Sequence, residues 1–146
     1  MTLRAPSKKG CPAVPTAPPG ANVNQNMAKA KIQGIFNPLA PLWFYNQVNY
    51  GGAMDYKTQG AQYEDFGNFN YGATGTAAYA PSFTLLRAAG WAQRGHPSSP
   101  QFGGNPGSLP GMVLNPFGGT APYGDDPHDQ QMIQQGIQYA RMGCGG

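Results

Sequence analysis

Hydrophobic residues recur every three or four positions in four stretches of the chain, and this spacing predicts four helices. The first stretch covers residues 24–36, where Met27, Ile32, Ile35 and Phe36 can share one apolar face. A shared apolar face is normally the side of a helix that packs against the rest of the domain.

The second and third stretches each begin at a proline, the residue favoured at the first helical position. Residues 41–48 are dense enough in aromatic side chains to predict a buried helix, which stops at Gly51 and Gly52. Residues 81–94 form the third stretch, with Gly95 just past its end. Its apolar side comprises Leu85, Leu86, Ala89 and Trp91.

The last stretch carries the clearest helix signals. Asp126 is a good N-cap, Pro127 occupies the first helical position, and Asp129 lies in the first turn. Arg141 suits the C-terminal end and Gly143 ends the helix. The apolar stripe of this helix comprises Met132, Ile133, Ile137 and Ala140.

The remaining segments are rich in glycine and proline. Residues 1–23 predict a disordered, Pro-rich N-terminal arm or linker, residues 55–79 a turn-rich stretch, and residues 95–124 a long surface loop. Strand signals are scarce. The pattern therefore predicts a small, mainly α single domain over residues 24–146 with long Gly/Pro-rich loops, and an α+β, lysozyme-like fold is the alternative.

The positive charges concentrate before residue 32, which five of the nine Lys and Arg residues precede. The chain that follows carries four positive and six negative side chains. Nucleic-acid-binding proteins cluster Lys and Arg near their site, so this balance disfavours a nucleic-acid partner without excluding one. No apolar run approaches the ~18 residues of a membrane span, so we expect no membrane insertion.

The two cysteines, Cys11 and Cys144, lie near opposite ends of the chain. They could form one disulfide or remain two unrelated thiols, and the sequence does not decide between these. Neither has a second Cys or His at metal-ligand spacing, which disfavours a zinc site. Residues 1–20 lack the apolar segment of a secretory signal, so export would need another route.

The densest candidate site is YEDFGNFNYG, residues 63–72, which contains the only glutamate of the chain. Aromatic neighbours would desolvate Glu64 and make it a general acid near neutral pH, and Asp65 would support it. Alternatively, these two acids begin a helix or turn and the aromatic residues form core. In the functional interpretation, polar side chains would bind the hydroxyl and acetamido groups of a sugar; these are Lys57, Tyr63, Asn68, Asn70 and Tyr71.

A second polar cluster, residues 123–129, precedes the last helix. Asp126 and Asp129 have structural roles there, which leaves Asp125 and His128 for function. Glycosidases usually need two carboxyl groups. The second would be Asp125, as a distant partner of the first acid, or Asp65, unless the acetamido group of the substrate assists instead. A three-ligand metal site from Asp125, His128 and Asp129 is disfavoured, because two of the aspartates already have structural roles. We therefore expect no metal site, and we also expect no cofactor.

Another set of residues predicts a ribonuclease-type site. His96 and His128 could transfer protons while Lys57 binds the phosphate. No spacing rule supports this set, and His96 could equally be a solvated loop residue.

Five motifs, in order over residues 40–140, resemble the bacterial polymorphic toxin type 44 domain. They are WFYN at 43–46, DYK at 55–57, YEDFGNFNYGATG at 63–75, LRAAG at 86–90 and PYGDDPHDQ at 122–130. The resemblance implies the toxin tip of an exported protein. It also implies delivery without a signal peptide by type VI secretion or a related machine, an upstream delivery protein or fused carrier domain, and a cognate immunity protein.

Three functions compete for such a domain. The first is a peptidoglycan-cleaving glycosidase or lytic transglycosylase that acts in the periplasm of the target cell, with Glu64 as the general acid and Asp65 and Asp125 as further catalytic residues. The second is an RNase toxin that uses His128 or His96 with Lys57. The third is a non-catalytic structural domain of a secretion particle.

Overall fold

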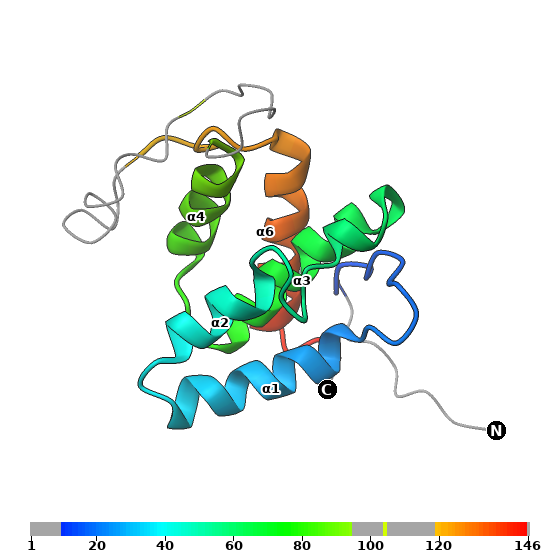
Figure 1. Cartoon of the computed structure of the whole chain (residues 1–146), viewed down its shortest axis with the longest axis vertical. Helices are drawn as coiled ribbons and strands as arrows, with labels where there is room; N and C mark the ends of the chain where they lie inside the picture. Colours follow the sequence, from blue (N-terminus) through cyan, green and yellow to red (C-terminus); the bar gives the residue numbers. More distant parts are fainter. Residues whose placement is uncertain (1–9, 95–103, 105–118, 146) are drawn as a thin grey trace.

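A computed structural model describes residues 10–94, 104 and 119–145 of the chain (Figure 1). Two single-turn 3-10 helices, η1 (Lys57–Gln59) and η2 (Ala61–Tyr63), precede the central helix. The longer helices are α1 (Val23–Phe36), α2 (Ala40–Val48), α3 (Glu64–Ala77), α4 (Ser82–Arg94) and α6 (Pro127–Arg141). The described part of the chain contains no strand, so the mainly helical, small single domain is confirmed and the α+β alternative finds no support.

The core forms where α3 and α6 cross (Figure 1). Gly72 and Gly136 let the two backbones touch. A Cβ on Gly72 would collide with the carbonyl oxygen of Ile133 in α6, and a Cβ on Gly136 would collide with that of Phe69 in α3. Such close approach is available only to glycine. The crossing fixes the relative position of the two helices and therefore of their N-termini.

The prediction of a turn-rich stretch over residues 55–79 is wrong for its larger part, because α3 occupies Glu64–Ala77. Glycine and asparagine lower helix propensity, but tertiary packing supplies most helix stability and overrides that preference. Phe66, Phe69 and Ala73 lie three and four positions apart and are almost completely buried. This spacing is the helix signal that the glycines and asparagines obscure.

The predicted apolar face of the first helix is wrong except for Met27, which packs against the core. α1 buries Val23, Asn26 and Ala30, whereas the predicted core residues Ile32 and Phe36 are 57% and 78% exposed. The small and polar side of α1 is the side that fits closely against α3, so its large apolar residues face outward. In the same way, α2 buries only Ala40 and Phe44 of its residues.

The last helix agrees with its prediction. The Asp126 carboxylate caps α6 by accepting the backbone N–H of His128 at 2.8 Å, and Ile133 and Ile137 are buried as expected. The third predicted helix is α4, with Leu85 in the core. Of the predicted loop, residues 95–103 and 105–118 lie outside the described residues.

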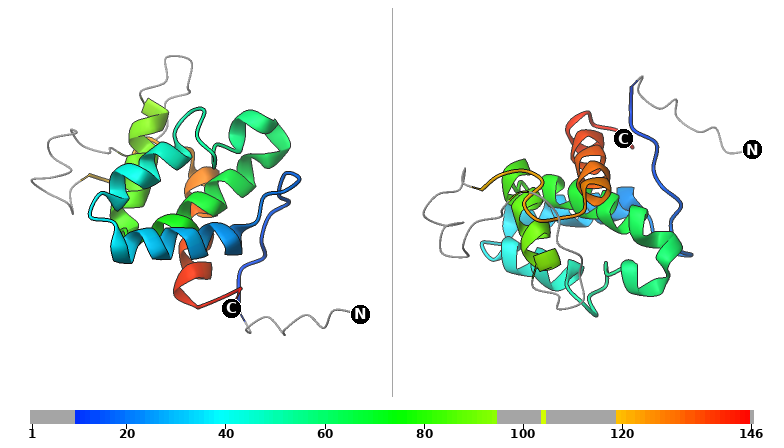
Figure 2. Two further views of the ribbon diagram at one scale, coloured as in Figure 1. Left: turned by 60° about the horizontal axis from the view of Figure 1, so that its bottom comes forward. Right: turned by 90° about the horizontal axis from the view of Figure 1, so that it is seen from above.

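A disulfide between Cys11 and Cys144 joins the N-terminal arm to the end of the last helix (Figure 2), which decides the alternative that the sequence left open. Residues 10–22 follow the body of the domain, with Pro18 buried and Cys11, Ala17 and Ala21 packed against the core. Residues 1–9 lie outside the described part. No helix among the described residues is long and apolar enough to cross a membrane.

Candidate functional site

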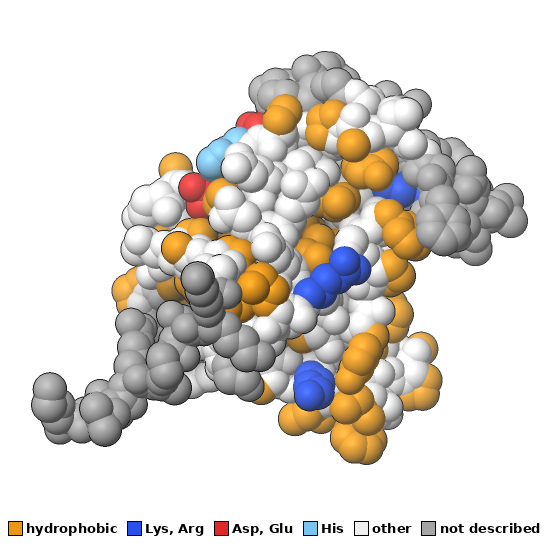
Figure 3. Space-filling model, turned by 180° about the vertical axis from the view of Figure 1, so that it is seen from behind, with side chains coloured by type: hydrophobic (Ala, Val, Ile, Leu, Met, Phe, Trp, Pro, Cys, Tyr) orange, Lys and Arg blue, Asp and Glu red, His pale blue; other side chains and the backbone are white. Residues whose placement is uncertain are grey.

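The N-termini of α3 and α6 bring together most of the acidic side chains of the protein. Figure 3 shows Asp, Glu and His side chains gathered at the upper left of the molecule. We call this region the acidic end, and it comprises Lys57, Glu64, Asp65, Asp125, Asp126, His128 and Asp129. It holds five of the six Asp and Glu residues of the chain, Asp55 being the sixth.

An ion pair joins the two helices across the acidic end. The Nε2 atom of His128 lies 2.8 Å from Oδ1 of Asp65, and both side chains are about half exposed. The hydrogen bond to Asp65, followed by the charge of that carboxylate, raises the pKa of His128 above its ordinary value. The pair therefore holds the imidazole in one orientation and favours its protonated form.

Asp129 is a buried carboxyl group beside this pair. Its residue is 5% exposed, and burial raises its pKa to about 6, from an ordinary value of 3.8. Lys57 opposes this rise, whereas the negative charges of Glu64 and Asp125 add to it. Asp129 can therefore hold a proton at a pH where an ordinary aspartate has lost it.

Asp125 is buried as well and is held by hydrogen bonds. Its carboxylate accepts the side-chain N–H of Gln130 at 2.8 Å and the backbone N–H of Asp126 at 2.9 Å. Burial raises its pKa, and the hydrogen bonds and Lys57 oppose that rise. Gln130 also donates to the backbone carbonyl of Leu86. This network fixes the chain at the entrance of α6 and links it to α4.

Lys57 supplies the positive charge of the acidic end. It begins η1 and is exposed, and its charge lowers the pKa of both Asp125 and Asp129. A Cβ on Gly67 would lie 3.3 Å from Cγ of Lys57, so the lysine stem packs over α3 at that glycine. The structure thus brings Lys57 close to Asp125 and Asp129, and its contact with a substrate stays a prediction.

Glu64 lies on the surface, at the first position of α3. The expectation that aromatic neighbours desolvate it is wrong, because those rings point into the core while the first turn of the helix faces water. Glu64 and Asp65 also begin a helix, as the structural alternative stated. Burial instead raises the pKa of Asp125 and of Asp129. Asp129 lies close enough to Glu64 for the charge of Glu64 to raise its pKa further.

The predicted sugar-binding residues occupy less accessible positions. Asn68 and Asn70 are 3% and 0% exposed. Asn70 accepts a hydrogen bond from Asn26, which also donates to the Tyr56 hydroxyl. Among the described residues, the amide nitrogens of Asn68 and Asn70 have no hydrogen-bond partner. These asparagines line the interior beneath the acidic end, and their contact with a substrate stays a prediction.

The two tyrosines that were predicted to bind the sugar, Tyr63 and Tyr71, are not simple surface residues either. Tyr71 donates its hydroxyl hydrogen to the backbone carbonyl of Leu85 at 2.6 Å. Burial, and then the charge of Asp125, raise the pKa of Tyr71 far above its ordinary value. Tyr63 ends η2 and is half-buried directly before Glu64. Tyr71 therefore serves the packing of α3 against α4.

Sequence reasoning did not predict that Asp129 is a buried acid of the candidate site, because it assigned this residue to the helix N-terminus. The available signal was its spacing. Asp129 lies four and seven positions before Ile133 and Gly136, on the face of α6 that packs against α3. An acid on the buried face of an amphipathic helix is a candidate for a perturbed carboxyl group. His96 lies outside the described residues.

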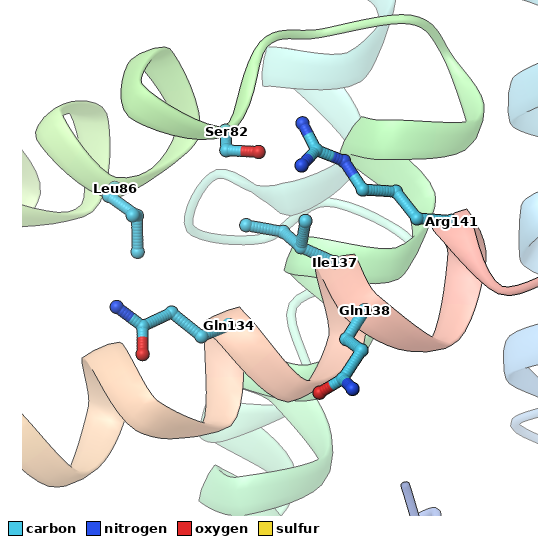
Figure 4. Close-up of a pocket in the computed structure, with 6 residues that line it drawn as sticks. All are labelled: Ser82, Leu86, Gln134, Ile137, Gln138 and Arg141. Carbon is cyan, nitrogen blue, oxygen red and sulfur yellow. The ribbon is translucent and has the colours of Figure 1, made fainter. Parts of the chain in front are cut away.

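No set of three or more His, Cys, Asp or Glu side chains in the described part of the chain is arranged to hold a metal ion. A shallow hollow of about 370 Å³ lies elsewhere, between α4 and α6 (Figure 4), lined by Ser82, Leu86, Gln134, Ile137, Gln138 and Arg141. It contains none of the acidic-end residues. The candidate site is thus a surface where two helix ends meet rather than this hollow.

The resemblance seen in the sequence motifs agrees with the comparison to known families. The family model described as bacterial toxin 44 matches residues 24–142. No curated protein and no solved structure matches the chain. The matched residues include all of the acidic end and the described helices, apart from Val23 at the start of α1. The chain therefore belongs to the bacterial toxin 44 family, whose members are polymorphic toxin domains.

Proposed function

We propose that this toxin domain cleaves the glycan strands of peptidoglycan by acid–base chemistry at the acidic end. One observation carries the proposal, namely that a buried carboxyl group, Asp129, lies beside a water-exposed one, Glu64. Two neighbouring carboxyl groups in such different environments can hold different protonation states at one pH. Glycosidases need this combination of a protonated acid and an ionised partner.

The environments suggest which carboxyl group has which role. Asp129 retains a proton near pH 6 and is the better general acid. Water solvates the Glu64 carboxylate, which suits it to act as the base or to stabilise positive charge on the sugar. This assignment moves the acid from Glu64 to Asp129. Asp65 keeps its supporting role through His128, and Asp125 remains a candidate partner.

The charge of the acidic end favours a glycan over a nucleic acid. Five carboxyl groups face one lysine and one histidine in this region. A ribose-phosphate chain carries one negative charge for each nucleotide and binds where positive charges outnumber negative ones. The sugar rings of a glycan strand are neutral, so acidic side chains do not repel them.

The His128–Asp65 pair favours a second candidate, an RNase-type toxin. A carboxylate 2.8 Å from an imidazole orients it for proton transfer to or from a hydroxyl. Lys57 would then stabilise the charge that develops on the phosphate. His96, the other histidine of this hypothesis, lies outside the described residues.

Four variants separate these candidates. Glu64→Gln and Asp129→Asn keep side-chain shape and remove acidity, His128→Gln removes the imidazole, and Asp55→Asn is a matched control at the one acid outside the acidic end. Each would be incubated with purified peptidoglycan and with total RNA, and the products analysed by mass spectrometry. We expect the first two to lower muropeptide release about a hundredfold or more, and the control to act as the wild type does.

The opposite results have equally clear meanings. RNA breakdown that only His128→Gln abolishes, with intact peptidoglycan, would establish the RNase candidate. Inactivity of the folded wild-type chain on both substrates would leave the non-catalytic alternative.

Membership of a toxin family also supports a setting for this activity. We propose that a cognate immunity protein neutralises the domain and that an upstream delivery protein or fused carrier domain exports it through type VI secretion or a related machine. Its substrate would place its action in the periplasm of the target cell. An oxidising compartment of that kind suits the Cys11–Cys144 disulfide.

A further inference from the structure

A second surface of the molecule exposes apolar side chains where α1 turns into α2. Five large residues there are between 54% and 78% exposed. We call them the apolar edge, which comprises Ile32, Ile35, Phe36, Leu39 and Leu42. Figure 3 shows hydrophobic side chains gathered at the lower right of the molecule, at the opposite end from the Asp, Glu and His side chains.

The apolar edge is continuous because of helix geometry and one tight turn. Ile32, Ile35 and Phe36 are three and four positions apart and share the outer side of α1. The turn that follows is short, since the Asn37 side chain accepts the backbone N–H of Leu39 at 2.9 Å. Contiguous exposed apolar surface of this kind marks an interaction site.

Lysines flank the apolar edge. Lys29 precedes Ile32 by three positions and Lys31 precedes Ile35 by four, so both lie beside the apolar stripe. Both lysines are exposed, and neither α1 nor α2 contains an Asp or Glu residue. The outer side of α1 therefore carries an apolar stripe with positive charge at its margins.

We propose that the apolar edge adsorbs to the surface of anionic lipid bilayers, with no segment crossing the membrane. A helix with an apolar side and flanking lysines is the pattern of interfacial membrane helices, whose apolar side chains enter the boundary between headgroups and acyl chains. Lipid phosphates attract the lysines, which extend their charged ends to the headgroups.

Two other occupants fit the same surface less well. Lysine is depleted in protein–protein interfaces relative to the rest of the surface, whereas here it borders the stripe on α1. A second copy of the chain would bring the lysines of both copies into one interface, and neither α1 nor α2 contains an Asp or Glu residue to pair with them. An anionic bilayer provides an apolar environment for the stripe and negative headgroups for the lysines.

Adsorption through the apolar edge would also orient the molecule. The acidic end lies at the other end of the view in Figure 3, so the bilayer would repel it and the candidate site would face away from the membrane. The inference does not depend on the reaction at that site, because it rests on a separate surface.

The test measures co-sedimentation of the full chain with vesicles. Vesicles of equal parts phosphatidylglycerol and phosphatidylcholine are compared with vesicles of phosphatidylcholine alone. We expect binding to the anionic vesicles that weakens as salt is added and much weaker binding to the neutral ones. Peptidoglycan and RNA assays run in parallel keep a failure of the proposed reaction distinct from a failure of adsorption.

Matched variants assign the binding to the apolar edge. The double variant Phe36→Ser and Leu39→Ser should lower vesicle affinity at least about tenfold. Lys29→Gln with Lys31→Gln should lower it about 25-fold, since each surface lysine contributes about fivefold. Val14→Ser and Arg141→Gln remove an exposed apolar residue and an exposed cation elsewhere, and should bind as the wild type does.

Each contrary result overturns the proposal. Wild-type protein that stays in the supernatant with anionic vesicles excludes adsorption. Edge variants that bind as tightly as the wild type assign the attraction to other basic residues. Sedimentation equilibrium that shows a wild-type dimer, abolished by the Phe36→Ser and Leu39→Ser pair, assigns the surface to a second copy. Circular dichroism of each variant confirms that the helices are retained.

Discussion

Polar side chains are usually exposed and large apolar side chains are usually buried. The acidic end and the apolar edge depart from this distribution in opposite ways. At the acidic end, the carboxyl groups of Asp125 and Asp129 are buried, although burial disfavours their charged form. At the apolar edge, Phe36 and its neighbours face water, although covering them would be favourable. Places where a sequence departs from the ordinary distribution of polar and apolar residues are often functional.

The difference between the two regions lies in how they are supported. The acidic end stands on α3 and α6, the two helices in closest contact, and hydrogen bonds fix several of its side chains. The apolar edge stands on α1 and α2 at the periphery. Substitutions at the supports of the acidic end should therefore affect stability strongly, whereas substitutions at the apolar edge should not.

The largest effect is expected at the helix crossing beneath the acidic end. Gly136→Ala places a Cβ against the backbone carbonyl of Phe69, which no side-chain movement relieves. We expect a loss of about 5 kcal/mol in the free energy of unfolding, most of the stability of a small domain. Urea denaturation followed by circular dichroism measures it.

Gly67→Ala is the matched control for that substitution. The nearest atom to its new Cβ is Cγ of Lys57 at 3.3 Å, on a flexible side chain that can shift. The alanine favours the helix by up to about 1 kcal/mol. Equal effects of the two substitutions would show that the crossing does not depend on backbone contact at Gly136.

The second-largest effect concerns the disulfide. Cys11→Ser removes a bond that joins residues 133 positions apart and frees the N-terminal arm. A disulfide that closes so long a loop contributes about 4 kcal/mol, chiefly by restricting the unfolded chain. Urea denaturation of the wild type with and without dithiothreitol should reproduce the loss, and the reductant should leave the stability of Cys11→Ser unchanged.

The helices that support the two regions also differ in how well the sequence predicted them. Sequence reasoning found α6 because its signals are local, namely an N-cap, a proline and an apolar stripe within one segment. It missed α3 because glycines that weaken an isolated helix are what allow this one to touch α6. The same reasoning wrongly predicted that Ile32 and Phe36 are buried, because periodicity identifies an apolar face without showing whether another element covers it.

For the candidate site, the sequence supplied the residues but not their pairing. Glu64, Asp65, Asp125 and His128 were all candidates. The contact between Asp65 and His128 spans 63 positions, and no spacing rule connects residues so far apart. The perturbed acid, Asp129, depends on burial at a helix–helix contact that only the folded arrangement creates.

A smaller effect, which depends on pH, is expected at Asp129. Folded Asp129 holds its proton up to a pKa of about 6, whereas an unfolded carboxyl group releases it near 3.8. The folded state therefore binds more protons between these values, and the free energy of unfolding falls as the pH rises through this range. The full loss is about 2 to 3 kcal/mol.

Asp129→Asn tests this sign directly, because the amide does not ionise. The difference between variant and wild-type stability should be small below pH 4 and should favour the variant increasingly up to about pH 7. His128 also loses stabilisation as the pH rises. Asp65 is the main cause of its raised pKa and the charge of Asp129 adds only a smaller part, so most of that contribution is common to both proteins and cancels in the difference. A variant that is less stable than the wild type at pH 7 would contradict burial as the cause of the raised pKa.

The smallest effect is expected at the apolar edge, and it sharpens the contrast with the core. Phe36→Ala removes a ring that is 78% exposed, and it should change the free energy of unfolding by no more than about 0.5 kcal/mol. Phe66→Ala removes the same ring from a site that is 1% exposed and should cost about 4 kcal/mol. Urea denaturation of the pair at several protein concentrations makes the comparison. A loss above about 1 kcal/mol for Phe36→Ala that grows with concentration would mean that another copy covers the apolar edge in solution.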